Sequence, residues 1–242
     1  MADRVIFLTD STSSMHPDEF NELSSGEVLH RLQSGSLSHQ ELRRLIIEAE
    51  AIDFESEHVA PLKVVLRDFI TRYRESNDPD DLLSVGAAIR KYVATSKADE
   101  ALSYSAQLLD AGPRAPIPLE VELELVKMIV RKLTANPPEQ NDALPQLGDR
   151  LWEIADTYLN PRLLTREKYG AIALNAILGL VLLRSRHVAE VLRNVSELKA
   201  TWFRQSLARR SARLHDELKK GSSGAPPADL VSSLEELEAQ YV

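Results

Sequence analysis

Hydrophobic side chains recur every three or four residues along most of the chain after residue 16, a period that matches one face of an α-helix. After Glu41 the apolar positions are Leu42, Leu45, Ile46 and Ala49. After Pro61 they are Leu62, Val65, Leu66, Phe69 and Tyr73. Because polar residues fill the positions between them, each stretch predicts an amphipathic helix with one buried face.

Residues that start and stop helices divide this pattern into segments. Ser38 is followed three residues later by Glu41, which is the spacing of a capping box. Asp78 and Pro79 suit the N-cap and the first position of another helix. Further helix starts are expected at Pro61, Ser96, Thr165 and Asp229. Helix ends are expected at Gly112, at the three prolines of residues 113–118 and at Gly221.

The pattern predicts an all-α fold with roughly nine or ten helices joined by short connections. Short connections favour antiparallel neighbours, so the expected architecture is a multi-helix antiparallel bundle or an α-solenoid. Over residues 61–220 the rhythm of helix pairs resembles that of HEAT and armadillo solenoids, although no residue pattern repeats with the helices. The resemblance concerns helix rhythm alone and implies no particular activity.

The segments also predict how the chain is divided. An extended segment is expected over residues 1–15 and an all-helical domain over residues 16–220. The most loop-like interior stretch suggests a sub-boundary near residues 136–145. Small residues and prolines predict a flexible linker over residues 221–227, followed by a short acidic amphipathic helix over residues 228–242.

Composition narrows the classes of site and compartment. The chain has no cysteine, which excludes disulfides, cysteine-ligated zinc, iron–sulfur clusters and a thiol nucleophile, and fits a reducing, cytoplasmic environment. The apolar stretch of residues 5–9 is too short for the hydrophobic region of a secretory signal. The longest apolar run, residues 170–183, contains Asn175 and is shorter than the about 20 residues that cross a bilayer, so it predicts a buried core helix and no membrane partner.

Charge is distributed unevenly along the chain. Residues 184–220 carry ten Lys/Arg and four Asp/Glu, a net charge of +6, whereas the whole chain has a net charge of −8 and the rest therefore −14. If residues 196–220 form one helix, its apolar stripe consists of Phe203, Leu207, Leu214 and Leu218. A basic arc beside the stripe consists of Lys199, Arg209, Arg210, Arg213 and Lys220, with Trp202 inside it.

Three interpretations of this basic arc follow. It is a solvated or intramolecular face, a surface for an acidic protein partner, or a nucleic-acid surface. Trp202 can stack on a base, make a cation–π contact, anchor an interface, or simply reach a neighbouring helix. The acidic remainder of the chain opposes binding to phosphate backbones, so a protein partner is favoured over nucleic acid.

The acidic segment at the C-terminus has a second apolar stripe. Its members are Leu230, Leu234, Leu237 and Tyr241. A helix this short gains order by burying such a stripe. The segment therefore packs within its own domain, docks onto a partner, or folds over the basic helix and masks it.

Signatures of catalysis are missing from the sequence. It contains no P-loop, dinucleotide-binding glycine motif, HExxH zinc motif or nucleophile elbow. Glu27 with His30, and Glu55 with His58, have the E-x-x-H spacing of di-iron bundles. The first pair lies in a short glycine-flanked segment and the second in an expected loop. We therefore predict no metal site, no cofactor and no catalytic residue.

Together these observations predict a non-catalytic helical scaffold or adaptor in the cytoplasm that binds a protein partner. The binding surface is the basic arc, the C-terminal amphipathic segment, or both. The alternative is a nucleic-acid-associated helical protein that uses residues 184–220, and the third possibility is an enzyme whose sequence carries no readable signature. The sequence gives no indication of the oligomeric state.

Overall fold

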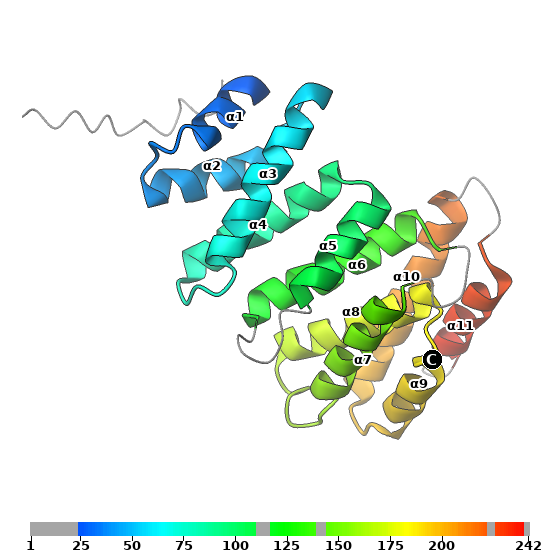
Figure 1. Cartoon of the computed structure of the whole chain (residues 1–242). Helices are drawn as coiled ribbons and strands as arrows, with labels where there is room; N and C mark the ends of the chain where they lie inside the picture. Colours follow the sequence, from blue (N-terminus) through cyan, green and yellow to red (C-terminus); the bar gives the residue numbers. More distant parts are fainter. Residues whose placement is uncertain (1–23, 110–116, 139–143, 222–225, 240–242) are drawn as a thin grey trace, which may run out of the picture.

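The computed structural model describes residues 24–109, 117–138, 144–221 and 226–239, and the secondary structure in these ranges is entirely helical (Figure 1). The predicted all-α class is therefore confirmed. The helices of the described ranges are α1 (Ser25–Gln33), α2 (His39–Ala51), α3 (Ser56–Tyr73), α4 (Pro79–Thr95), α5 (Ala98–Leu109), α6 (Leu119–Ala135), α7 (Pro145–Tyr158), α8 (Glu167–Leu183), α9 (Val188–Glu197), α10 (Thr201–Gly221) and α11 (Ala228–Ala239). The extended segment expected over residues 1–15 lies outside the described residues.

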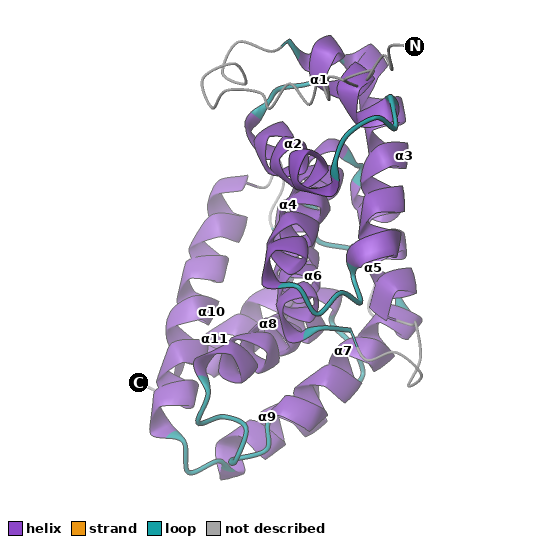
Figure 2. Cartoon of the chain, turned by 90° about the vertical axis from the view of Figure 1, so that its left-hand side faces the viewer, coloured by secondary structure: helices purple, strands orange, loops and turns teal. Residues whose placement is uncertain are grey.

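The first eight helices form stacked pairs, in the manner of an α-solenoid (Figure 1). In one layer, α2 packs on α4, α4 on α6 and α6 on α8. The partners α1, α3, α5 and α7 lie against this layer (Figure 2). This arrangement places one face of every second helix along the same side of the molecule.

The last three helices pack around the end of the stack. The helix α9 contacts α7 and α8, whereas α10 contacts α6 and α8. The helix α11 packs on α10 and on α8. Figure 2 shows α10 standing beside the layer of α2, α4, α6 and α8. The part of the basic segment that forms α10 therefore lies along the same side as this layer.

Two apolar cores meet at α6. Val121, Leu125 and Met128 belong to the N-terminal core, which is formed by residues of α1 to α6. Val126, Ile129, Val130 and Leu133 belong to the C-terminal core, which extends from α5 to α11. The change from one core to the other therefore lies at α5 and α6, ahead of the sub-boundary expected near residues 136–145.

The helix α8 is the centre of the C-terminal core. Almost every residue of its apolar run is buried, as the composition of the run predicts. Gly179 lets α7 approach closely, because a Cβ atom there would lie 2.9 Å from Cδ1 of Leu151. None of the described helices is both long enough and apolar enough to cross a bilayer.

Several helix starts confirm the sequence prediction. The Ser38 hydroxyl accepts a hydrogen bond from the Glu41 amide (3.3 Å), and the Glu41 carboxylate accepts one from the Ser38 amide (2.9 Å), which completes the capping box. Asp78 caps α4 by accepting a hydrogen bond from the Asp80 amide at 2.9 Å, and Pro79 is the first residue of that helix.

Other predicted helix starts are wrong. The helix α3 begins at Ser56, before Pro61, because His58 already donates a backbone hydrogen bond to Glu55. Thr165 is no cap, since its hydroxyl donates to the carbonyl of Arg162 instead of accepting from α8.

Two further starts are shifted along the chain. Ser96 is the C-cap of α4, and the first backbone bond of α5 runs from Ala101 to the carbonyl of Lys97. Asp229 is the second residue of α11, which begins at Ala228. Both helices start within two residues of the predicted positions.

The helix predicted over residues 196–220 is also wrong, because it is interrupted. Leu198 has an extended backbone (φ −67°, ψ 133°) that ends α9, and α10 starts at Thr201. The sequence between these helices contains neither proline nor glycine, so the interruption has no strong local signal.

Candidate functional site

A polar pocket of about 460 Å³ lies between α4, α6, α8 and α10. Its lining residues, named here the cationic pocket, are Arg90, Glu124, Lys127, Arg131, Asn175 and Arg210. They come from four different helices, and α8 and α10 belong to the C-terminal core whereas α4 belongs to the N-terminal core. The pocket is therefore built by the packing of the two halves against each other.

Arg90 holds the acidic groups beside the pocket. Its Nε and Nη2 atoms donate to the carboxylate of Glu50 at 2.6 and 2.9 Å, and its Nη1 donates to Glu124 at 3.0 Å. These hydrogen bonds raise the pKa of Arg90, and the bond with Glu50 has the largest effect. Burial opposes the rise because it disfavours the charged form. Arg90 in turn lowers the pKa of Glu50. Glu50 thus remains ionised and paired with Arg90 at neutral pH.

The remaining cations of the pocket differ in how they are paired. Lys127 donates to Glu124 at 3.1 Å. Arg131 and Arg210 form no hydrogen bond or ion pair with another side chain in the described part of the protein, although the charge of Arg131 helps to lower the pKa of Glu50. Two guanidinium groups therefore line one pocket with donors available to a ligand.

Two residues near the cations give the pocket its shape. Gly86 lies one turn before Arg90, and a Cβ atom there would be 3.4 Å from Nη1 of Arg90 and 3.4 Å from Cγ of Glu124. Asn175 is the polar residue within the apolar run of α8 and is only 8% exposed. Its amide nitrogen donates to the carbonyl of Ala171 at 2.7 Å, which leaves a second N–H.

Most residues of the predicted basic arc lie on α10, as the helical spacing indicates. They are Trp202, Arg209, Arg210, Arg213 and Lys220. Lys199 is an exception and a correction, because it lies in the turn between α9 and α10 and not on the helix. Arg210 lines the cationic pocket, whereas Lys199, Arg209, Arg213 and Lys220 are exposed outside it.

Trp202 reaches a neighbouring helix. A Cβ atom on Gly170 of α8 would lie 2.6 Å from Cη2 of Trp202, so the glycine leaves room for the indole. The ring also meets Phe203 edge to face, with centroids 5.7 Å apart. Trp202 is still 46% exposed, but it does not line the cationic pocket.

The apolar stripe of the C-terminal segment is covered by the chain itself. Leu230, Leu234 and Leu237 are fully buried in the C-terminal core, whereas Tyr241 lies outside the described residues. In this structure the three leucines are therefore not available to a partner.

Polar contacts hold α11 on a different side of α10 from the pocket. Ser211 donates to the carbonyl of Leu234 at 3.2 Å, and Nδ1 of His215 lies 3.3 Å from Oε1 of Glu238. In the described residues α11 contributes nothing to the lining of the cationic pocket.

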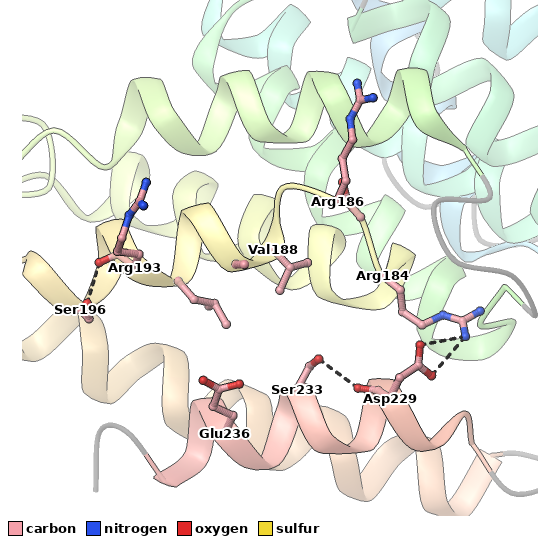
Figure 3. A pocket seen from close by; sticks show the side chains of 11 residues that line it. Arg184, Arg186, Val188, Arg193, Ser196, Asp229, Ser233 and Glu236 are labelled. Carbon is pink, nitrogen blue, oxygen red and sulfur yellow. Dashed lines mark hydrogen bonds and ion pairs between the residues drawn. The ribbon is translucent and has the colours of Figure 1, made fainter.

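A second hollow, of about 590 Å³, lies between α9 and α11 (Figure 3). Two of its arginines are held by carboxylates, one of them inside the lining and the other outside it. Arg184 faces Asp229 at 3.3 Å and also donates to the carbonyl of Pro138, and Arg186 pairs with Asp149 at 2.9 Å. Three arginines and two carboxylates line the hollow, so its charges nearly balance, in contrast to those of the cationic pocket.

The two E-x-x-H pairs are not assembled into one site. Glu27 closes the capping box of α1 with Ser24. His58 lies near Glu55 and Glu57 at the start of α3, with ligand atoms all within 4.8 Å of one another, but both carboxylates are exposed to solvent. His58 also lies 3.3 Å from the hydroxyl of Ser25. Exposed carboxylates at the start of a helix interact favourably with the positive end of the helix dipole, which accounts for their position.

Sequence reasoning missed most of the cationic pocket. Asn175 was noticed only as an interruption of the apolar run. The available signal was the pair Lys127 and Arg131, which lie four residues apart and hence on one side of α6. Arg90 gave no signal, because its role depends on tertiary contacts with α2 and α6.

Comparisons of the chain with protein-family models, curated proteins and solved structures gave no match.

Proposed function

We propose that this protein is a non-catalytic helical scaffold that binds an acidic segment of a protein partner along the layer of α2, α4 and α6 beside α10. The single observation that carries the proposal is the placement of Arg131 and Arg210. These guanidinium groups come from different helices, line one polar pocket, and form no hydrogen bond or ion pair with a carboxylate among the described residues. An acidic ligand would supply the missing counter-charges.

Further cations extend the surface beyond the pocket. Arg213 is exposed and follows Arg210 by three residues, which puts it on a neighbouring position of the same side of α10. Arg209 and Lys220 are exposed on the same helix. A partner seated in the pocket would therefore meet additional positive charge along α10, which speeds association and aligns the partner.

Apolar side chains lie next to the charged groups on the same layer. Ile47 of α2 and Leu83 of α4 are exposed and line one shallow hollow. Ile47 precedes Glu50 by three residues, and Leu83 precedes Arg90 by seven, so each lies on the same side of its helix as the ion pair. An acidic segment with apolar anchors complements this combination better than a bare polyanion does.

The experiment is a pull-down from native extract with tagged full-length protein. Each sample is analysed with and without nuclease treatment of the extract. We compare the wild type with Arg131→Glu/Arg210→Glu and with the matched control Arg72→Glu/Arg162→Glu, whose residues are exposed arginines outside the pocket. We expect a protein that survives nuclease to bind the wild type and the control but not the pocket variant. Because like charges repel the acidic segment, charge reversal gives a larger effect than neutralisation.

Two outcomes would contradict the proposal. Recovery that disappears with nuclease would favour nucleic acid as the ligand of the basic surface, with a steep dependence on salt. Equal recovery by the pocket variant and the control would show that the partner binds elsewhere.

A further inference from the structure

We infer that the cationic pocket takes a phosphate monoester dianion, carried by the acidic partner segment as a phosphorylated side chain. The inference rests on the proposed function and makes it more specific. It adds the chemical group that the pocket selects. A surface that merely attracts acidic segments would not distinguish a phosphate from a carboxylate.

The charge balance of the pocket favours a dianion. The cations are Arg90, Lys127, Arg131 and Arg210, and the acids that face them are Glu50 and Glu124. These side chains leave two positive charges in excess. A single carboxylate would compensate only one of them, whereas a phosphate monoester carries about −1.5 to −2 at pH 7.

The available donors also fit a phosphate group. Arg131 and Arg210 offer guanidinium forks, which match phosphate oxygens in bidentate geometry. The Lys127 ammonium has three N–H groups, of which its hydrogen bond to Glu124 uses one. Asn175 adds an amide N–H from the floor of the pocket. Phosphate presents three strong acceptor oxygens to such a set, whereas a carboxylate presents two.

The position of the pocket strengthens these interactions. Its acids are hydrogen-bonded to Arg90 and form no ion pair with Arg131 or Arg210, although the charge of Arg131 still acts on Glu50. Asn175 and Glu124 are largely buried, so charges act more strongly beside them than beside Arg131, which is exposed. The donors come from helices that pack on both cores, so their spacing is set before a ligand arrives, which lowers the entropy cost of binding.

The first test titrates full-length protein with O-phospho-L-serine, inorganic phosphate and L-glutamate, and follows binding by calorimetry. We expect both phosphate compounds to bind at least about tenfold more tightly than glutamate. We expect Arg131→Gln/Arg210→Gln to weaken phosphate binding at least about tenfold, and the control Arg72→Gln to change it less than about twofold. Thermal unfolding checks that each variant is folded, and the single variants Arg131→Gln and Arg210→Gln replace the double variant if it is not.

Two results of this titration overturn the inference. One is equal affinity for glutamate and phosphate, and the other is wild-type affinity of the pocket variants for phosphate. Failure of both phosphate compounds to bind overturns it as well.

The second test separates the inference from the proposed function. Two labelled peptides of glutamate, leucine and alanine residues are compared, one with a central phosphoserine and one with serine. Tighter binding of the phosphopeptide, lost in Arg131→Gln/Arg210→Gln, supports both proposals. Equal binding of the two peptides overturns the phosphate inference and keeps the acidic partner. A phosphopeptide that binds no more tightly than free phosphoserine overturns the partner segment as its carrier, and failure of both peptides contradicts both proposals.

Discussion

Both halves of the molecule have an apolar core, and they differ in the contacts that surround it. In the N-terminal half, ion pairs join helices that are distant in sequence, such as Lys63 of α3 with Glu100 of α5 at 2.7 Å. In the C-terminal half, α8 is surrounded by apolar side chains over almost its whole length. Ion pairs depend on atomic geometry, whereas apolar packing depends mainly on filled volume, so the two halves respond differently to mutation and to pH.

Asp81 shows how the N-terminal half uses charge. The carboxylate is 5% exposed and accepts hydrogen bonds from Nε of Arg43 and from the hydroxyl of Ser76, both at 2.6 Å. Nε2 of His39 lies 2.8 Å away. These contacts tie α2 to the start of α4, so the register of the first stacked helices depends on one buried acid.

The largest effect is expected from Leu180→Ala in α8. Leu180 is fully buried, and removal of its side chain leaves a cavity that costs about 3 kcal/mol of the free energy of unfolding. Urea denaturation measures the change. The exposed Leu83 is the control, because Leu83→Ala removes no buried contact and costs less than about 0.5 kcal/mol. Similar losses for the two variants would contradict a packed core around α8.

The next effect is expected from Asp81→Asn, which lowers the free energy of unfolding by about 2 to 3 kcal/mol at pH 7, because Arg43 loses a charged partner in a half-buried position. Burial alone would raise the pKa of Asp81, but the hydrogen bonds from Ser76 and Arg43 outweigh burial and hold the pKa below the ordinary value of 3.8.

The same variant has a defined dependence on pH. A carboxyl with a lowered pKa stabilises the folded state above its unfolded pKa and loses that contribution as pH falls through the folded pKa. We therefore expect the difference between Asp81→Asn and the wild type to be full above about pH 4 and to shrink at more acidic pH. Denaturation at several pH values measures it, and a difference that stays constant to strongly acidic pH would show that the charge of Asp81 is not the cause.

A smaller effect tests a polar contact in the apolar half. Ser211 is fully buried and donates to the carbonyl of Leu234 in α11. We expect Ser211→Ala to cost about 1 kcal/mol, because a buried carbonyl loses its donor. Hydrogen exchange should accelerate in α11 more than in α2. Unchanged exchange in α11 would show that its leucines alone hold it in place.

The smallest effect is expected from Glu122→Gln on α6. Burial raises the pKa of Glu122, and the hydrogen bond donated by Tyr158 only partly offsets this. An acid with a raised pKa takes up a proton on folding, so wild-type stability falls as pH rises above the unfolded pKa through the folded one. We expect Glu122→Gln to raise the melting temperature slightly at pH 7 and not at pH 4. A lower melting temperature at pH 7 would show that the carboxylate is stabilising there.

Local features of the fold were predictable from the sequence, because their causes lie within a few residues. The capping box of Ser38 and Glu41, the start of α4 at Pro79 and the burial of the apolar run in α8 are examples. The interruption after Glu197 was not predictable, since residues 198–200 contain no proline or glycine. Beyond the break the neighbours change, because α9 packs on α7 and α8 whereas α10 packs on α6, α8 and α11.

The cationic pocket was less predictable than the fold. The sequence placed Arg210 beside the apolar stripe of α10, and helical periodicity is sufficient for that inference. It could not indicate that Arg90 and Arg131 lie near Arg210, because helical periodicity shows which face of a helix is polar but not which faces meet. Lys199 was assigned to the helix for a different reason, because the break before it carries no local signal.

The sharing of α6 by both cores has a consequence for protein fragments. A chain divided between residues 138 and 144 would leave the N-terminal piece with Val126, Ile129 and Leu133 uncovered, and the C-terminal piece without the helix on which α8 packs. Neither piece would fold stably alone, yet each would carry the apolar surface that covers the other. The two pieces should therefore reassemble when produced together, which makes this chain a natural choice for fragment complementation.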